Sequence, residues 1–442
     1  KKCLEYTKYK AGKASEEEIK AEVNNIAKKI RTIISPLVVR RSRLDLQGIP
    51  EYADDLKQQN IQLVLPNDPV ELEYDLSELK DLYLSTLDQI NKSEGSSDAV
   101  YRFKAARYSP ALYIRKDLRD KLAKELEDKT GVKFNLLLGR QTNISSFMRH
   151  LLVARFESSV AAFQASLGYM IQSSEHMLKW IEKRHKIPVF KKGNLPDVEA
   201  FYESSDDGME EFEELFEKYE SRGFFEIDMK YVNDDFVTDV EDDIRLLKKL
   251  REQWFGEDNT VKSDPKLDSF ICIVRKQMND EPNRKLIVFS EFADTVNYLG
   301  EALAKAGLPV MKYTSADASP ANKDRIRANF DAGLKPALQK NDFHILVATD
   351  AISEGYNLHR AGAIFNYDIP YNPTRVIQRI GRINRINKKV FDELYIYNYF
   401  PTDVGEAETR TKEISTLKMA MIHAIMGEDT KALTKEEDIQ AY

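Results

Sequence analysis

The stretch Lys285–Leu299, KLIVFSEFADTVNYL, decides the fold of the C-terminal part of the chain. It opens with a short apolar run, 285–290, that has the length and composition of a buried strand. A helical pattern follows over residues 292–306. A buried strand that leads directly into a helix is typical of βαβ units, in which helices join parallel strands.

The same alternation continues to residue 399. Strands are predicted at 309–314, 344–348, 363–366 and 393–399, and helices at 322–332 and 373–385. Because such crossovers are right-handed, the pattern predicts an α/β fold, a parallel sheet with helices on both faces. Ligands bind at the carboxyl ends of the strands of such sheets, which is where Ser290, Thr349, Asp350 and Asp368 fall.

The chain before residue 265 has a different texture. A helix is expected to end at Pro36, with Ser15 and Glu18 at the spacing of a capping box. From about 75 to 255 the pattern is mostly long helices, which include 78–90, 118–129 and 145–171. We therefore divide the chain into three parts. These are 1–48, the end of a first lobe and a junction; 49–265, a large, mostly α-helical insert; and 266–442, a second lobe with a C-terminal helix.

The net charge of −7 is unevenly distributed. Residues 197–243 hold 19 acidic side chains against three basic ones, so the remainder of the chain is net basic. Within this acidic segment, residues 208–220 keep apolar side chains at helical spacing and are expected to form a solvated helix. Since charge acts within a Debye length of about 10 Å, the acidic balance does not exclude nucleic acid as a partner.

Several classes of protein are disfavoured by composition. Two cysteines, Cys3 and Cys272, support neither a disulfide framework nor a four-ligand zinc site, and the six histidines form no metal-binding spacing. We therefore expect no protein-bound metal. No apolar run is long enough to span a membrane and no signal peptide opens the sequence, so we expect a cytoplasmic protein without a membrane partner.

Residues 376–387, VIQRIGRINRIN, contain three arginines and no acidic residue. In a helix, Gln378, Arg382 and Arg385 share one face and the isoleucines occupy the opposite one. Arg379 lies about 100° from Gln378 and is expected to serve packing or a salt bridge. The pattern alone fits an amphipathic surface helix with a solvated basic face.

Three segments, 285–299, 345–358 and 365–386, occur in this order at strand-to-loop positions. The last carries Asp-x-Pro-x-Asn-Pro from Asp368 and then Gln-Arg-x-Gly-Arg-x-x-Arg from Gln378. Together they resemble the second RecA-like lobe of superfamily-two helicases, specifically the Swi/Snf family of DNA translocases and its bacterial HepA-like branch. The resemblance covers 285–399 strongly and 33–90 weakly, with Arg40 and Arg41 similar to the junction between the two lobes of the family.

The resemblance implies a role for each motif residue. Arg382 and Arg385 would be catalytic arginine fingers, because an arginine from a facing domain can speed phosphoryl transfer by about 10³ to 10⁵. The residues expected to contact nucleotide are Gln378, Glu354, Gly355 and Asp350. The residues expected to contact nucleic acid are Ser290, Thr349, Asn372, Arg40 and Arg41.

The sequence contains no GxxxxGK[ST] loop, the element that cradles phosphates in this class of ATPase. It also begins with Lys1 instead of Met. We therefore expect a piece of a longer ATP hydrolase in which ATP and magnesium are bound mainly by a missing N-terminal RecA-like lobe. This chain alone is then expected to be inactive.

The leading hypothesis is an ATP-dependent translocase that tracks along double-stranded DNA, with RNA as another partner. One alternative is a strand-separating DNA or RNA helicase. Another is a RecA-like binding or scaffold module without catalysis.

Overall fold

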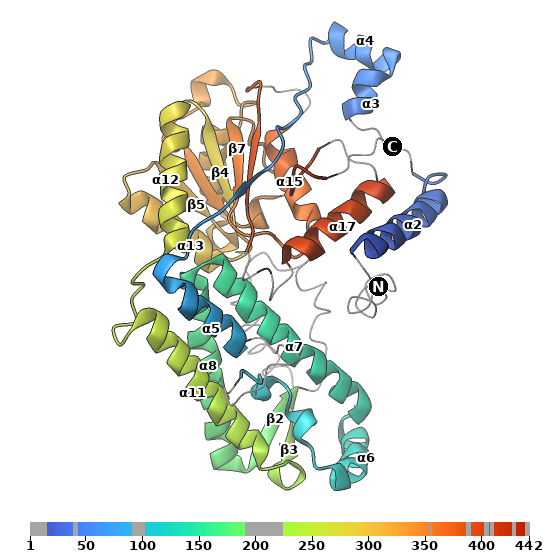
Figure 1. The fold of residues 1–442 in the computed structure, drawn as a ribbon, viewed down its shortest axis with the longest axis vertical. Coiled ribbons are helices and arrows are strands. Elements are labelled where there is room, and N and C mark those ends of the chain that lie inside the picture. The colour runs from blue at the N-terminus through green and yellow to red at the C-terminus, as the bar shows by residue number, and fades with distance from the viewer. Residues whose placement is uncertain are drawn as a thin grey trace.

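The protein is described by a computed structural model that covers two parts of distinct architecture (Figure 1). The residues described are 16–38, 43–90, 102–131, 133–190, 224–353, 355–385, 390–401, 406, 411–426 and 430–437. We call the part built on the larger sheet the sheet lobe, and the part built on α5–α11 the helical subdomain.

The sheet lobe is built on six strands in the order β1-β8-β7-β4-β6-β5, and every neighbouring pair is parallel. The strands are β1 (Val70–Leu72), β4 (Lys285–Phe289), β5 (Val310–Tyr313), β6 (Ile345–Ala348), β7 (Ala361–Asn366) and β8 (Tyr395–Tyr399). The predicted parallel α/β sheet is therefore confirmed. The sequence assigned residues 70–72 to the helical insert, whereas β1 adds an edge strand next to β8, because three residues are too few for a periodic signal.

Helices cover both faces of this sheet, as expected. The strand β4 alternates: Leu286 and Val288 pack in one core with α12 and α13, whereas Ile287 and Phe289 pack in another with α14 and α15. These helices are α12 (Pro265–Asp280), α13 (Ala293–Lys305), α14 (Pro320–Phe330) and α15 (Thr374–Ile383). The C-terminal helix α17 (Thr411–Met426) joins the α15 side through Met419 and packs against α2 (Glu16–Ile34). The short helices α3 (Arg43–Gly48) and α4 (Pro50–Gln58) lie together beyond the far end of the lobe (Figure 1).

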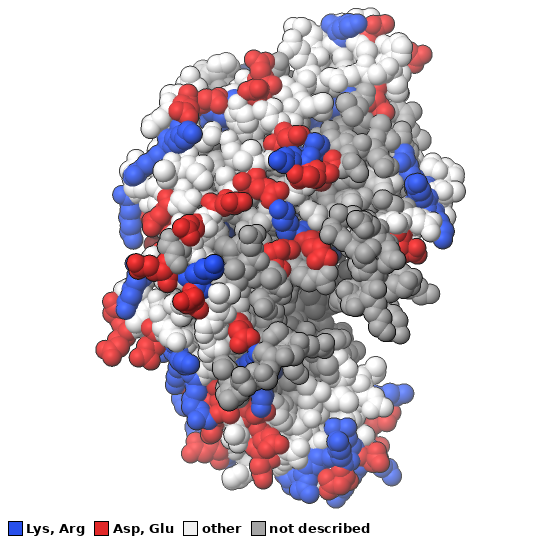
Figure 2. All heavy atoms as spheres, in the orientation of Figure 1, with Lys and Arg blue, Asp and Glu red and all other residues white. Residues whose placement is uncertain are grey.

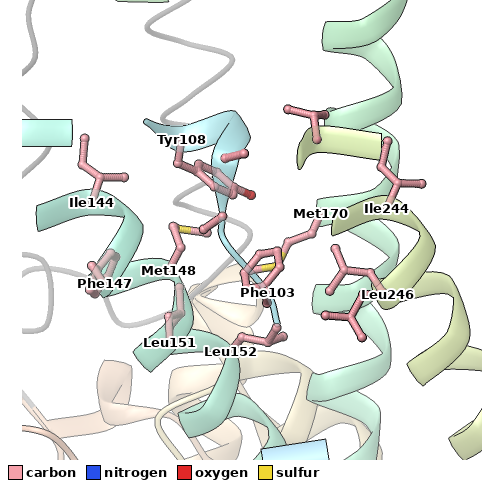
Figure 3. Close-up of a cluster of buried hydrophobic side chains, with 14 of the residues drawn as sticks. Phe103, Tyr108, Ile144, Phe147, Met148, Leu151, Leu152, Met170, Ile244 and Leu246 are labelled. Atoms are coloured by element: carbon pink, nitrogen blue, oxygen red, sulfur yellow. The ribbon is translucent and has the colours of Figure 1, made fainter. Parts of the chain in front are cut away.

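The helical subdomain has its own hydrophobic core. Its elements are α5 (Lys80–Ile90), α6 (Arg119–Thr130), α7 (Phe134–Ser158), α8 (Val160–Arg184), α11 (Asp235–Phe255) and the antiparallel hairpin of β2 (Lys186–Phe190) and β3 (Phe224–Asp228). Side chains from three helices meet in the interior, among them Met148 and Leu152 of α7, Met170 of α8 and Ile244 of α11 (Figure 3). Phe103, from the segment between α5 and α6, lies among them. The helical subdomain thus folds around one core.

The sequence predicts one helix over 145–171, but the structure breaks it in two. Ser159 has an extended backbone, with φ −157° and ψ 155°, and its Oγ accepts a hydrogen bond from the backbone N–H of Ala162 at 3.0 Å. A serine side chain that satisfies a free helical N–H is a favoured start of a helix. The apolar periodicity continues across this break, so the sequence pattern alone does not reveal it.

Short 3₁₀ turns connect several of these elements. They are Ser77–Leu79, Ala106–Tyr108, Pro110–Tyr113, Lys116–Leu118, Met229–Tyr231, Ser315–Asp317, Pro336–Leu338 and Asp350–Ser353. The last of these turns follows β6 directly and begins with a predicted site residue.

Some expectations fall outside the described residues. These are the capping serine Ser15, the acidic helix at 208–220, the junction arginines Arg40 and Arg41, and Glu354. Among the residues that are described, no helix is long and apolar enough to cross a membrane.

Candidate functional site

The candidate site lies at the carboxyl ends of β4, β6 and β7, which the sequence predicted. Asp368 accepts three hydrogen bonds here. Its Oδ2 accepts from the Ser290 hydroxyl at 2.5 Å and from the Ser158 hydroxyl at 2.6 Å, and its Oδ1 accepts from the backbone N–H of Glu291 at 2.7 Å. Asp368 therefore fixes the loop after β7 against the end of β4.

Two arginines of α15 point into the lobe. Arg379 is fully buried. Its guanidinium donates two parallel hydrogen bonds to Asp350, Nε to Oδ1 and Nη2 to Oδ2, each at 2.7 Å. Its Nη1 donates to the Asn366 side chain at 2.8 Å, and its guanidinium lies 4.9 Å from the ring centre of Phe289. Arg375 reaches the same carboxylate at 3.3 Å. Arg379, expected to serve packing or a salt bridge, is thus both buried and ion-paired.

The other face of α15 is turned outward. Gln378 is exposed, and Arg382, one turn later, is partly exposed. The helix ends at Ile383, two residues earlier than predicted, and Arg385 follows it as an exposed residue. The three side chains predicted to share a face are therefore all accessible, while Ile380 and Ile383 are buried.

The loop after β6 contains the remaining predicted nucleotide contacts. Asp350 is buried and engaged by Arg375 and Arg379. Gly355 is exposed and has φ +78°, a left-handed conformation that strongly favours glycine. The structure thus separates the two residues, with Asp350 inside the fold and Gly355 at its surface.

The predicted nucleic-acid contacts differ in exposure. Ser290 and Thr349 are fully buried, and the Thr349 backbone N–H donates to the Tyr313 carbonyl at 3.1 Å. Asn372 is partly exposed, and its Oδ1 accepts from the Thr374 hydroxyl at 2.7 Å at the start of α15. Of these three side chains, Asn372 is the one at the surface.

Charge is mixed on one face of the molecule. Figure 2 shows Lys and Arg interspersed with Asp and Glu over this face, without one broad basic surface. A nucleic-acid track with phosphate contacts would need clustered cations, so this face does not have that character.

Sequence reasoning missed one buried carboxylate at the site. Glu291 follows Ser290 and lines a cavity of about 50 Å³ together with Asp368, Glu157, Lys266 and His150. Burial, followed by the nearby Asp368, raises the pKa of Glu291 to about 8. Nothing in a single glutamate after a strand signals such burial, because it depends on the packing of the helical subdomain.

The residues present fit only one side of a bound nucleotide. Arg382, Arg385 and Gln378 offer cationic and amide donors, which suit phosphate oxygens. No cluster of three or more acidic, histidine or cysteine side chains suited to a metal ion occurs in the part of the chain that the structure covers. The donor set therefore fits phosphate but not magnesium.

Part of this chain matches a known protein family. Residues 266–387 match the family model described as the helicase conserved C-terminal domain. This match supports a helicase C-terminal lobe over α12 to α15, the coarser part of the expectation from sequence.

Curated relatives are also named as helicases. The chain is 29% identical over 183 residues to the uncharacterized ATP-dependent helicase YqhH of Bacillus subtilis, a match that covers 40% of this chain and 28% of that protein. It is 22% identical over 281 residues to the ATP-dependent RNA helicase RhlB of Shewanella denitrificans, which covers 63% and 60%. The chain thus spans between about a quarter and three fifths of these two relatives.

Among solved structures, the helicase domain of Pyrococcus furiosus Hef aligns with 80% of this chain and 58% of its own. The sequence identity is 15% and the TM-score is 0.37.

Proposed function

We propose that this chain forms the second lobe of an ATP-dependent, nucleic-acid-stimulated helicase or translocase of the Swi/Snf type. The observation that carries the proposal is the division of the arginines on α15 and just after its end, inside the segment that matches the helicase C-terminal domain. Arg375 and Arg379 pair with the buried carboxylate of Asp350. Arg382 and Arg385 are instead accessible beside Gln378.

This division separates a structural from a chemical role. The pair between Arg379 and Asp350 locks α15 to the loop after β6, so the helix is held rigidly. A rigid support is what a catalytic side chain needs to keep its geometry. Arg382 and Arg385 would then present positive charge to a phosphoryl group held by a facing lobe and stabilise the charge of the transition state.

ATP and magnesium would be bound mainly by that facing lobe. The sequence of this chain lacks the phosphate-cradling loop, and its accessible donors suit only one side of the phosphates. Gly355 and Gln378 would contribute from the surface of this lobe, and Asp350 would act through the arginines that it holds.

Nucleic acid would lie along the same edge of the sheet. Asn372, which is partly exposed, would contact a phosphate directly, and the buried Ser290 and Thr349 would support the loops on either side of it. Since such contacts address the backbone and not the bases, we expect little sequence preference. Double-stranded DNA is the proposed track.

The names of the relatives favour one further candidate, an RNA helicase. RhlB is described as an ATP-dependent RNA helicase, and its match covers more of this chain than the match to YqhH. Both functions use the same lobe geometry, so only an assay of the full-length protein separates them.

The test is a comparison of ATP hydrolysis and strand displacement in full-length protein. Hydrolysis stimulated by duplex DNA without release of a strand supports the translocase, and release of a strand from an RNA or DNA duplex supports the helicase. Absence of stimulated hydrolysis would instead support a RecA-like binding or scaffold module without catalysis. In parallel, calorimetry of this chain with ATP and magnesium should show no binding in the micromolar range, and such binding would overturn the two-lobe argument.

A further inference from the structure

The connection between α7 and α8 is buried against the sheet lobe. We call residues 155–160 the elbow. Its two serines, Ser158 and Ser159, are both buried, and Ser159 breaks the helix with its extended backbone. A sharp bend made of two polar residues would be costly in an interior unless the polar groups found partners.

Those partners come from the sheet lobe. The Thr295 hydroxyl, at the start of α13, lies 2.8 Å from the Ser158 hydroxyl and 2.7 Å from that of Ser159. Lys266, at the start of α12, donates to the carbonyls of Glu157 at 2.9 Å and Ser158 at 3.1 Å. A cation on the last carbonyls of α7 also complements the helix dipole.

A buried ion pair reinforces this contact. The guanidinium of Arg155 is fully buried, pairs with Asp294 of α13, and lies 5.0 Å from the ring centre of Phe292. The elbow is thus held to the sheet lobe by directional bonds as well as by apolar packing.

One bond from the elbow reaches the candidate site. The Ser158 hydroxyl donates to Oδ2 of Asp368, the same oxygen that accepts from Ser290. Among the described residues, three donate to Asp368: Ser290 and Glu291 of the sheet lobe, and Ser158 of the helical subdomain. His150 of α7 lies near the same loop, with its ring centre 6.2 Å from that of Tyr371.

The loop that receives these contacts leads directly into α15. Asp368 and Tyr371 precede Asn372, whose side chain binds the first residue of the helix, Thr374. A shift of the elbow relative to Asp368 would therefore be transmitted to the loop and to the start of α15. Hydrogen bonds to a buried carboxylate are strong enough to make such a contact directional.

We propose that the elbow couples the helical subdomain to the 368–373 loop, with Ser158 as a positioning residue for Asp368. The inference rests on the proposed function, since the loop matters for activity only if α15 carries the arginine fingers. In this view, movement of the helical subdomain on nucleic acid would change the placement of α15.

The test uses Ser158→Ala, which removes the donor to Asp368 without adding volume. Ser173→Ala is the matched control, because Ser173 lies in α8 and its hydroxyl donates to carbonyls of its own helix. Hydrogen exchange in this chain reports the coupling itself: Ser158→Ala should speed exchange at Asp368, Ile369 and Tyr371, and Ser173→Ala should not.

Kinetics of the full-length protein report the positioning role. Loss of one hydrogen bond to a charged group predicts a roughly tenfold lower kcat in the presence of nucleic acid. The KM for ATP should stay unchanged, because this lobe does not carry the main nucleotide site. Thr295→Val, which removes the hydroxyl shared by both serines at constant shape, should shift both readouts in the same direction.

The outcomes are separable. Exchange in the loop that is equal for Ser158→Ala and Ser173→Ala overturns the coupling, and faster exchange with an unchanged kcat overturns the positioning role. A wild-type protein without stimulated hydrolysis defeats the proposed function instead, and the exchange measurement still decides whether the elbow holds the loop.

Discussion

Arg379 and Asp350 form a buried, two-pronged ion pair across the loop after β6 and the helix α15. Both bonds measure 2.7 Å, and the arginine is fully buried. Because both side chains are buried, the pair serves to hold the loop and the helix in fixed relation. The pair between Arg379 and Asp350 therefore fixes the placement of the accessible residues Gln378 and Arg382.

Arg379→Ala should strongly destabilise the sheet lobe. It removes both short bonds to the buried Asp350 carboxylate, and breaking a buried pair costs about 3–5 kcal/mol. Urea unfolding followed by circular dichroism measures the loss. Arg327→Ala on the exposed face of α14 is the control and should stay within about 0.5 kcal/mol of wild type. Equal unfolding midpoints for the two variants would contradict the structural role.

These same residues show which parts of the structure could be predicted from the sequence. The strands β4 to β8 and the helices α13 to α15 followed from periodicity, since apolar runs and helical spacing are local properties. The exposure of Arg382 also followed, because it lies on the polar face of α15. The burial of Arg379 was expected only as a packing or salt-bridge role. Its partner Asp350 lies 29 positions away, and no local pattern connects them.

The elements that the sequence missed depend on tertiary contacts. The strand β1 is three residues long and gains its place only by pairing with β8. Ser159 breaks a helix whose apolar pattern continues on both sides, and the reason is its place against Thr295. The buried Glu291 lines a cavity shared with His150 and Glu157 of the helical subdomain, a neighbourhood that no spacing within the lobe could reveal.

The stability of the protein should fall as pH rises from about 4.5 to about 8, in part because of Glu291. Burial raises its pKa from an ordinary 4.5 to about 8 in the folded protein. In that window the unfolded chain has released the proton that the folded chain still holds, so deprotonation favours unfolding. The contribution is fully present below pH 4.5 and is lost as pH rises through 8.

Glu291→Gln isolates this effect, because glutamine cannot ionise and keeps the shape of the protonated acid. The free energy of unfolding, measured with urea at pH 5 and at pH 8, should fall less in the variant than in wild type. If both proteins lose the same amount between the two pH values, Glu291 does not hold its proton as inferred.

Binding of the full-length protein to duplex DNA should weaken steeply with salt. Phosphate contacts release counterions, and even two such contacts give about a tenfold loss of affinity between 50 and 200 mM salt. Fluorescence anisotropy with a labelled duplex measures the slope. Asn372→Ala should weaken binding to unrelated duplex sequences alike, because it addresses the backbone. A salt-independent affinity would be at odds with a backbone-tracking enzyme.

The last prediction concerns the two accessible arginines of the α15 region. In full-length protein, Arg382→Ala and Arg385→Ala should each preserve folding and the affinity for ATP, because Arg385 is exposed, Arg382 is only partly buried, and nucleotide is held mainly elsewhere. Turnover should nevertheless fall by roughly two or more orders of magnitude, since the lost charge acts mainly in the transition state.

Arg327→Ala again supplies the matched control, an exposed arginine on α14 of the same lobe, and it should retain the wild-type rate. Arg379→Ala is unsuitable for this comparison, because its loss of activity would follow from loss of the fold. The decisive measurement is the steady-state ATPase rate of the three variants at saturating nucleic acid. If all three keep near-normal rates, the outward face of α15 is only a solvated surface. A loss confined to Arg382 and Arg385 separates catalysis from general surface charge, because all three substitutions remove one positive charge from the same lobe.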